Sequence, residues 1–377
     1  GMSFPISEAS PVRFSAPLPA RADVVVVGGG VIGVMTAWVL REKGLSVVLC
    51  EKGRIAGEQS SRNWGWVRQQ GRDPGELPIM VESLSIWKRL AAEMGDALGF
   101  RQTGVLYLAK TEKEIEGFEA WTEQPWVAVP ALAVAAEEMG VVIREACAVR
   151  GLDLAAGRVA GVVTEAGRIA CDHVVVAAGA WSRLFLGHLG VRIPQLSVLA
   201  SVAATEPMPE IFPGNAADDD FAFRRRADGG YSIAPGARHD FFIGRDAFAS
   251  FGVYLPVLKK DFRSTNFRLV APKGFPDAWG TPRRWALDRE SPFERQRILN
   301  PAPNMKTLAE LQDNFARAFP SLGRPKLKTA WGGMIDSLPD VVPVIDHAPI
   351  PGLTIATGMS GHGFGIGPGV GRVVADL

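Results

Sequence analysis

Residues 23–52 of the chain read "DVVVVGGGVIGVMTAWVLREKGLSVVLCEK". This stretch carries no charge from Val24 to Leu40, so it could enter a membrane or hold a nucleotide. A membrane-spanning helix needs about 20 apolar residues in continuous register, and each glycine lowers helix propensity by about 1 kcal/mol. Gly28 to Gly30 and Gly33 interrupt that register. The stretch therefore predicts a strand, a glycine turn and a helix.

The residues around the glycine turn complete a βαβ unit. Val24 to Val27 is a β-branched run typical of a buried parallel strand. Val31 to Arg41 carries helix formers, and Leu45 to Cys50 predicts a second buried strand. Glu51 stands at the end of that strand, 23 positions after Gly28, which is the usual spacing for a nucleotide-binding unit.

Composition excludes several classes of protein. Lys plus Arg number 41 and Asp plus Glu number 40, for a net charge of +1, which gives no electrostatic footprint for nucleic acid or an anionic membrane. Cys50, Cys147 and Cys171 are widely spaced and odd in number, and fit neither a zinc site nor a disulfide framework. We therefore expect no metal and a cytoplasmic location. We also expect no signal peptide, because Met2 to Arg21 is rich in Pro, Ala and Ser and has no apolar stretch of the required length.

The pattern along the chain predicts two domains in an α/β fold. One is a Rossmann-like dinucleotide-binding domain with a parallel sheet. The other is a substrate domain with a mixed, largely antiparallel sheet and helices, because residues 197–303 read as short alternating strands separated by Gly/Pro turns. The expected boundaries are residues 1–77, 130–196 and 304–377 for the first domain and residues 78–129 and 197–303 for the second. A brief passage at 121–131 and an uncapped helix at the end of the chain lead us to expect missing residues near 121–131 and after Leu377.

The glycine turn fits G-x-G-x-x-G in the required context, directly after a strand and opening a helix. Gly28 permits the tight turn, Gly30 lets the backbone approach a pyrophosphate, and Gly33 lets the helix pack closely on the strand. The helix N-terminus attracts the phosphates, and Glu51 can accept hydrogen bonds from the adenosine ribose. The same glycines also suit packing alone, and the motif by itself does not separate NAD from FAD.

The order of further segments resembles the D-amino-acid oxidase superfamily of FAD-dependent amine and amino-acid oxidoreductases, which includes glycine oxidase, sarcosine oxidase and gamma-glutamylputrescine oxidase. The resemblance covers nearly the whole chain. Besides "VVVVGGGVIG", it rests on "GRIAGEQSSRNWGWVRQQGR" (53–72), "HVVVAAGAWS" (173–182), "WGGMIDSLPDVVPVID" (331–346) and "GMSGHGFGIGPGVG" (358–371).

The resemblance implies a set of FAD contacts along the chain. The last glycine loop would lie beside the flavin ring, the loop after the second strand would hold the phosphates, and Val149 would touch adenine through its backbone. Gly179 and Trp181 would close over the pyrophosphate, although Trp181 and His362 each suit core packing or turn chemistry equally well. The full expected set is Gly28, Gly30, Val31, Ile32, Gly33, Glu51, Lys52, Ser60, Ser61, Arg62, Asn63, Val149, Ala178, Gly179, Trp181, Gly332, Gly333, Gly361, His362, Gly363 and Phe364.

The chain departs from several members of this superfamily. Gly333 stands where some members carry a flavin-linking cysteine, and Arg62 where others carry a flavin-linking histidine. We therefore expect FAD to be bound non-covalently. Gly365 and Ser232 replace two lysines that in sarcosine oxidase bind the substrate carboxylate and promote reaction with oxygen. These replacements argue against a simple sarcosine-like substrate.

The reaction that the resemblance implies is the oxidation of a C–N bond in an amino acid, an N-substituted amino acid or an amine. Hydride would pass from the carbon to flavin N5, and the resulting imine would hydrolyse; positioning and desolvation supply most of the catalysis. The candidates for positioning a substrate are Arg62, Trp64, His239, Tyr254 and Trp331.

Three hypotheses follow from the sequence. The first is an FAD-dependent amine or amino-acid oxidase or dehydrogenase acting on a small molecule. The second is a flavin-carrying subunit of a multi-subunit amine dehydrogenase, with a redox partner and no independent activity. The third is a nicotinamide dehydrogenase, which the terminal glycine loop and the long two-domain return disfavour.

Overall fold

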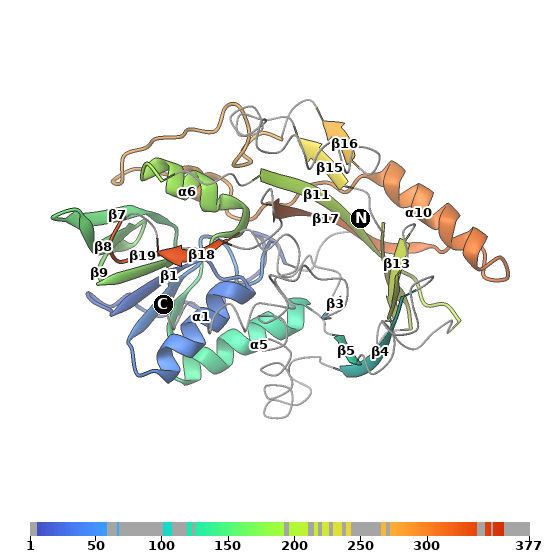
Figure 1. Cartoon of the computed structure of the whole chain (residues 1–377), viewed down its shortest axis with the longest axis horizontal. Coiled ribbons are helices and arrows are strands. Elements are labelled where there is room, and N and C mark those ends of the chain that lie inside the picture. Colours follow the sequence, from blue (N-terminus) through green and yellow to red (C-terminus); the bar gives the residue numbers. More distant parts are fainter. Residues whose placement is uncertain are drawn as a thin grey trace.

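A computed structural model gives the arrangement of the chain (Figure 1). It describes residues 6–58, 66–67, 101–107, 119–122, 125–191, 196–209, 215–217, 221–225, 229–235, 239–242, 265–268, 272–337, 344–347 and 350–357.

The first sheet has six strands, with β1 near its centre. β1 pairs in parallel with β2 on one side and with β10 on the other. The edge strand β18 is the exception, because it runs antiparallel to β19. In spatial order the strands are β18 (Val344–His347), β19 (Leu353–Thr357), β10 (His173–Val176), β1 (Val24–Val27), β2 (Val47–Cys50) and β6 (Val142–Arg144).

Both faces of this sheet are buried, which explains why β1 is an unbroken run of valines. Val24 and Val26 pack in one hydrophobic cluster with helices α1 (Val31–Glu42) and α5 (Pro125–Glu138). Val25 and Val27 belong to the cluster on the opposite face. That cluster contains α6 (Ser182–His188) and a small antiparallel sheet of β7 (Val149–Ala155), β8 (Arg158–Thr164) and β9 (Gly167–Ala170).

The second sheet has ten strands of mixed direction. β17 (Leu327–Ser337) pairs antiparallel with β11 (Leu196–Thr205) over the whole length of β11, off the main path of the sheet. The main path runs β16 (Thr265–Arg268), β15 (His239–Phe242), β11, β14 (Tyr231–Pro235), β13 (Phe221–Arg225), β12 (Asn215–Ala217), β4 (Arg101–Tyr107), β5 (Glu119–Thr122) and β3 (Trp66–Val67).

Helix α10 (Met305–Ala318) covers part of this second sheet (Figure 1). Its buried residues Leu308, Leu311 and Phe315 share a hydrophobic cluster with Tyr231 and Ile233 of β14. The helix is amphipathic, so a single apolar stripe is enough to fix it on the sheet.

The predicted fold class, an α/β dinucleotide-binding domain joined to a mixed, largely antiparallel sheet, is confirmed. Two segments differ from the expected domain boundaries. We expected residues 304–377 in the first domain, yet α10 and β17 pack with the second sheet. We expected residues 197–303 in the second domain, yet Phe275, Phe293 and Leu299 are buried against the first. The other boundaries stay predictions.

Helix α5 also begins earlier than the expected domain boundary at residue 130. It starts at Pro125 and contains Pro130 in its interior. Val129, Leu132 and Ala133 are fully buried in the cluster that α5 shares with α1. Burial of this apolar face offsets the cost of an interior proline, which is about 3 kcal/mol.

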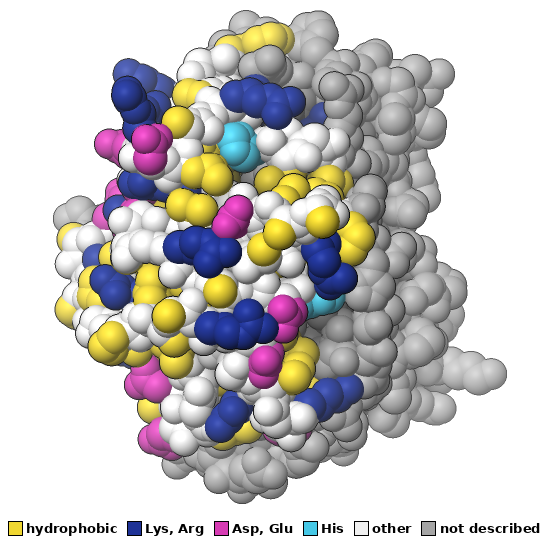
Figure 2. All heavy atoms as spheres, turned by 90° about the vertical axis from the view of Figure 1, so that its left-hand side faces the viewer, with side chains coloured by type: hydrophobic (Ala, Val, Ile, Leu, Met, Phe, Trp, Pro, Cys, Tyr) yellow, Lys and Arg dark blue, Asp and Glu magenta, His cyan; other side chains and the backbone are white. Residues whose placement is uncertain are grey.

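The outer face of the first domain is mixed in character. In Figure 2 basic side chains lie among acidic and apolar ones rather than in one continuous patch. Within the described ranges, no helix combines the length and the apolar character needed to cross a bilayer.

Candidate cofactor site

The glycine turn between β1 and α1 leaves no room for side chains at two positions. Gly28 has φ +114°, a backbone conformation that favours glycine. A Cβ at Gly28 would overlap the carbonyl oxygen of Ala177, and a Cβ at Gly33 would overlap the carbonyl oxygen of Gly28. These contacts bring α1 against β1 and place the turn beside the end of β10.

The turn is fixed by backbone hydrogen bonds from both neighbouring strands. Gly28 N donates to Cys50 O at 3.0 Å, and Ala177 N donates to Val27 O at 2.8 Å. Helix α1 begins after Gly30, whose backbone is extended and which carries no capping side chain. Its first turn contains no acidic residue. The positive end of the helix dipole therefore stands at the turn with no carboxylate of the helix itself to neutralise it.

Glu51 braces the turn from the end of β2. Its Oε1 accepts a hydrogen bond from Gly29 N at 3.0 Å, and its Oε2 accepts one from Gly53 N at 2.5 Å. Burial raises the pKa of Glu51 to about 7, against the opposing effects of Lys52 and of these backbone bonds. Each carboxylate oxygen can accept a further hydrogen bond, so Glu51 can hold a ribose hydroxyl while it orients the turn.

Val149 lies on the same side of the site as Glu51. Cys147 N donates to Glu51 O at 2.9 Å, and Ala146 N donates to Gly53 O at 3.0 Å. The chain from Ala146 to Val149 therefore runs beside the loop that follows β2. Val149 as a whole residue is 4% exposed, and the contact of its backbone with adenine stays a prediction.

Ala178 and Gly179 follow β10 and lie next to the turn. The Cα of Ala178 is 3.2 Å from where a Cβ on Gly28 would stand. Gly179 has φ +55° and opens the 3₁₀ helix η2 (Gly179–Trp181). The structure thus brings Gly28, Gly30, Gly33, Glu51, Ala178 and Gly179 to one edge of the first sheet, where its parallel strands end.

Lys52 and Trp181 are engaged with protein groups. Lys52 Nζ lies 2.7 Å from Glu58 Oε1 and also donates to Gln296 O and Arg297 O. Trp181 is 1% exposed, and its indole Nε1 donates to both carboxylate oxygens of Glu58 at 3.1 Å. The ring of Trp181 is thus packed among protein groups. Direct contact of either residue with a cofactor stays a prediction.

Glu58 is a residue that sequence reasoning missed. Besides Lys52 and Trp181, it accepts a hydrogen bond from Leu299 N at 2.9 Å. It stands two positions before the predicted phosphate-binding residue Ser60. A glutamate in a polar loop has no distinctive sequence pattern, and two of its three partners are distant in the chain, so no local signal could have found it.

The second sheet contains four more of the predicted residues, three in β17 and one in β15. Trp331, Gly332 and Gly333 are paired in β17 with Val202, Ser201 and Ala200 of β11. His239 opens β15 and is paired with Thr265 of β16. The roles predicted for these four residues stay predictions.

The remaining predicted residues lie outside the described part of the chain. They are Ser60, Ser61, Arg62, Asn63 and Trp64 after β2, Tyr254 in the second domain, and Gly361, His362, Gly363 and Phe364 in the last glycine loop.

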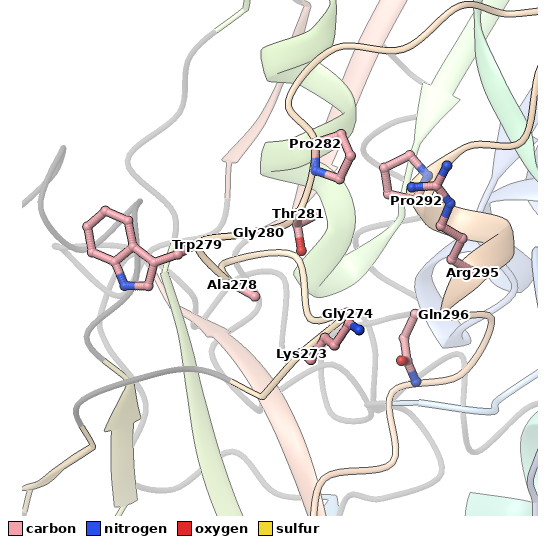
Figure 3. A pocket seen from close by; sticks show the side chains of 10 residues that line it. All are labelled: Lys273, Gly274, Ala278, Trp279, Gly280, Thr281, Pro282, Pro292, Arg295 and Gln296. Atoms are coloured by element: carbon pink, nitrogen blue, oxygen red, sulfur yellow. The ribbon is translucent and has the colours of Figure 1, made fainter.

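A cavity of about 540 Å³ lies elsewhere, between the loop 273–282 and helix α9 (Pro292–Arg295). In Figure 3 the ring of Trp279 points away from the other lining residues, and Trp279 is 50% exposed. None of the residues predicted to bind cofactor or substrate lines this cavity.

The described residues fit a dinucleotide. The two positions where a Cβ would overlap backbone atoms, the helix N-terminus and the carboxylate at the end of β2 together form a cradle for a pyrophosphate and a ribose. The fold and this edge of the sheet define a two-domain, dinucleotide-binding protein.

Comparison with known proteins identifies the family. The family model FAD dependent oxidoreductase (DAO) matches residues 23–127 and 119–377. The L-amino acid deaminase of Proteus vulgaris is 31% identical, with a TM-score of 0.87 over 99% of this chain and 96% of that chain. The deaminase of Proteus myxofaciens, solved with anthranilate, is 29% identical, with a TM-score of 0.88 over 98% and 93% of the two chains. Sarcosine oxidase subunit beta of Rhodobacter capsulatus is 23% identical over 95% of this chain and 84% of its own length.

The chain therefore belongs to the FAD dependent oxidoreductase family. The predicted resemblance and the predicted class of enzyme, an FAD-dependent oxidoreductase of the amino-acid and amine oxidising type, are confirmed.

Replacing Gly28 by Ala is expected to prevent FAD binding, because the Cβ would overlap Ala177 and force the turn to open. The measurement is the flavin-to-protein ratio after purification and dialysis against FAD, with far-UV circular dichroism as a check on folding. Gly44→Ala is the matched control: Gly44 also has positive φ, +87°, but nothing lies within 4 Å of its added Cβ. The control is expected to cost about 1 kcal/mol of stability and to keep its flavin. A Gly28→Ala protein with the flavin content of wild type would contradict this account of the turn.

The affinity of the apoprotein for FAD is expected to increase as pH rises from about 6 to about 8. A ribose hydroxyl donates most strongly to an ionised carboxylate, and Glu51 becomes ionised around its pKa of about 7. Titration of the apoprotein with FAD at several pH values measures the effect, and Glu51→Gln should bind FAD more weakly with no such pH dependence.

The free energy of unfolding of the apoprotein should change with pH in the opposite direction to the affinity for FAD. The pKa of Glu51 is raised from 4.5 to about 7 on folding, so between these values the native state holds a proton that the unfolded chain has lost. The contribution of Glu51 to the free energy of unfolding therefore falls as pH rises through that range. Identical pH profiles for wild type and Glu51→Gln in both measurements would contradict the assignment.

Proposed function

We propose that this protein oxidises the C–N bond of an L-amino acid with a free amino group, giving an imino acid that water converts to a 2-oxo acid and ammonia. The observation that carries the proposal is the similarity to the two Proteus L-amino acid deaminases. It extends over 98% and 99% of this chain, through both sheets. Sarcosine oxidase subunit beta matches nearly as much of the chain at lower identity, 23%.

The proposed substrate carries an aromatic or other apolar side chain. The deaminase of Proteus myxofaciens was solved with anthranilate, which combines a carboxylate, an amino group and an aromatic ring. The same three groups occur in an aromatic L-amino acid. Trp64 and Trp331, with Arg62, His239 and Tyr254, are the proposed residues for holding such a substrate. An arginine suits the carboxylate, and the indole rings suit the apolar side chain.

In the proposed reaction FAD, when bound, supplies the hydride acceptor: the hydrogen of the substrate Cα–H leaves with both bonding electrons. The groups that would hold this cofactor are the glycine turn, the N-terminus of α1 and Glu51. The amino group must be neutral for its lone pair to form the C=N bond, so its proton leaves to solvent or a nearby base. The residues of the second sheet then need only orient the Cα–H and exclude water.

We also propose that FAD is bound non-covalently. Position 333 lies within β17 and is glycine, so it offers no thiol. The three cysteines, Cys50, Cys147 and Cys171, are free and buried in the core of the first domain. Free thiols also support a reducing, cytoplasmic location.

Precipitation of the purified protein with acid is expected to release all of its flavin into the supernatant. Denaturation destroys the cradle, and no covalent bond remains to hold FAD. The absorbance of supernatant and pellet measures the partition. Yellow colour that stays with the washed pellet would contradict non-covalent binding.

A second candidate function is a flavin-carrying subunit of a larger enzyme. The observation that favours it is the match to sarcosine oxidase subunit beta over 84% of that protein, whose name implies a multi-subunit enzyme. Ser232, at the position of the lysine that promotes reaction with oxygen in sarcosine oxidase, is 1% exposed within β14. Transfer of electrons to a partner or to an acceptor other than oxygen accords with that replacement.

Anaerobic titration with amino acids separates the two functions. An L-amino acid such as L-phenylalanine is expected to bleach the flavin absorbance of the isolated protein, with its D-enantiomer and sarcosine at least about tenfold less effective per mole, a discrimination of about 1.4 kcal/mol. Bleaching by sarcosine or another N-methyl amino acid in preference would contradict the proposed substrate. A flavin that no compound bleaches would contradict independent activity and favour the subunit.

A further inference from the structure

The segment between the second sheet and α10 crosses over the first domain before it returns. We call residues 285–299 of this segment the strap. β16 belongs to the second sheet and α10 packs on that sheet, whereas Phe293 and Leu299 of the strap are 4% and 1% exposed in the core of the first domain. In Figure 1 the light-orange segment between β16 and α10, which includes the strap, passes above α6.

The strap contacts the chain on both sides of the predicted adenosine position. On one side, Arg297 NH1 donates to Lys52 O at 2.8 Å, and Lys52 Nζ donates to Gln296 O at 2.9 Å. Lys52 is the neighbour of Glu51. A Cβ on Gly53 would lie only 2.5 Å from Arg297 O, so the strap lies directly against the loop that carries the ribose carboxylate.

On the other side, the strap holds Arg150, the neighbour of Val149. Arg150 NH2 lies 2.6 Å from Glu294 Oε1, and Arg150 Nε donates to both Glu294 oxygens at 3.2 Å. Trp285 Nε1 donates to Arg150 O at 2.8 Å. The side chains of Arg150 and Glu294 are 15% and 7% exposed. Because this pair is desolvated and bidentate, it restrains the backbone far more than an exposed ion pair does.

One further ion pair joins these two sides. Arg297 donates to both oxygens of Glu165 at 3.0 and 2.9 Å, and Glu165 N donates to Ala148 O at 3.0 Å. A single strap residue thus holds the backbone of Lys52 and the strand end beside Val149.

The pKa shifts of Glu294, in the strap, and of Glu165, which pairs with Arg297 of the strap, agree with this network. Burial acts to raise the pKa of Glu294, but hydrogen bonds from Arg150 and Ser291 prevail and lower it to about 2. Glu294 therefore carries its charge throughout the physiological range. Burial raises the pKa of Glu165, partly offset by Arg297.

We propose that the strap positions the adenosine end of the cofactor site, and that Glu294 and Arg297 are positioning residues for FAD. They set the distance between the Glu51 loop and the Val149 strand without touching the cofactor. This inference rests on the proposed contacts of Glu51 and Val149 with the adenosine. Because such coupling is reciprocal, a ligand that binds more tightly when the strap is docked also stabilises the docked strap.

The first test is the affinity of the apoprotein for FAD and for ADP, which contains only the adenosine and the two phosphates. Glu294→Gln keeps the shape of the side chain but removes the charge that pairs with Arg150. The dissociation constants for FAD and ADP are expected to rise by similar factors, about tenfold each. With FAD saturating, kcat and the KM for the amino acid should equal those of wild type, because the flavin ring and substrate positions are unchanged.

Arg295→Gln is the matched control on the same helix. Arg295 pairs with Glu290 at 3.3 Å, and the two side chains are 56% and 60% exposed. Its loss is expected to change either dissociation constant by less than about twofold. Wild-type affinity for both ligands in a folded Glu294→Gln protein, or equal losses in Arg295→Gln, would overturn the proposal.

A second measurement does not depend on the stability of a variant. Hydrogen exchange of the wild-type apoprotein, with and without saturating ADP, reports on the strap directly. Peptides that cover residues 285–299 are expected to exchange more slowly with ADP bound, and peptides from α10 to be unaffected. Equal exchange of the strap in both states would overturn the proposal.

Glu51→Ala distinguishes failure of this inference from failure of the proposed cofactor site. If Glu51→Ala keeps wild-type affinity for FAD and ADP, the adenosine site is wrongly assigned and the strap inference falls with it. If Glu51→Ala weakens both ligands while Glu294→Gln does not, only the role of the strap is wrong.

Discussion

The close approach of helix α1 to strand β1 determines the geometry of the glycine turn and of the sheet edge beside it. Gly33 has no side chain to separate the helix from the carbonyl of Gly28, and Gly28 has none to separate the turn from Ala177. Any other residue at either position would move the helix N-terminus away from the sheet edge. This contact creates the cradle that we propose for the dinucleotide, and it places the ends of the neighbouring strands β2 and β10 beside the turn.

The sheet behind the turn serves two purposes because both of its faces are buried. The face of Val24 and Val26 packs α1 and α5, which supply hydrophobic stability. The face of Val25 and Val27 packs α6, the small antiparallel sheet and the segment that returns from the second sheet. The second face therefore carries the contacts between the first sheet and the strap.

The sequence predicts those features of the fold that residues close together in the chain determine. The valine run, the glycine spacing and Glu51 lie within one βαβ unit. In the structure β1 pairs in parallel with β2, and Glu51 contacts the glycine turn. The strap could not be predicted, because Arg150 and Glu294 are 144 positions apart and neither belongs to a motif. Likewise, α10 was expected in the first domain because chain order alone does not reveal which sheet its apolar stripe covers. The residues after β2 and in the last glycine loop were predicted from resemblance alone.

We propose that FAD lies along the edge where the parallel strands of the first sheet end, and a crystal structure of the flavin-loaded protein would locate it. We expect a ribose hydroxyl within about 2.5–3.2 Å of the Glu51 carboxylate, the pyrophosphate at the N-terminus of α1, and adenine against the backbone of Val149. A cofactor bound elsewhere, or one whose ribose does not reach Glu51, would contradict this proposal.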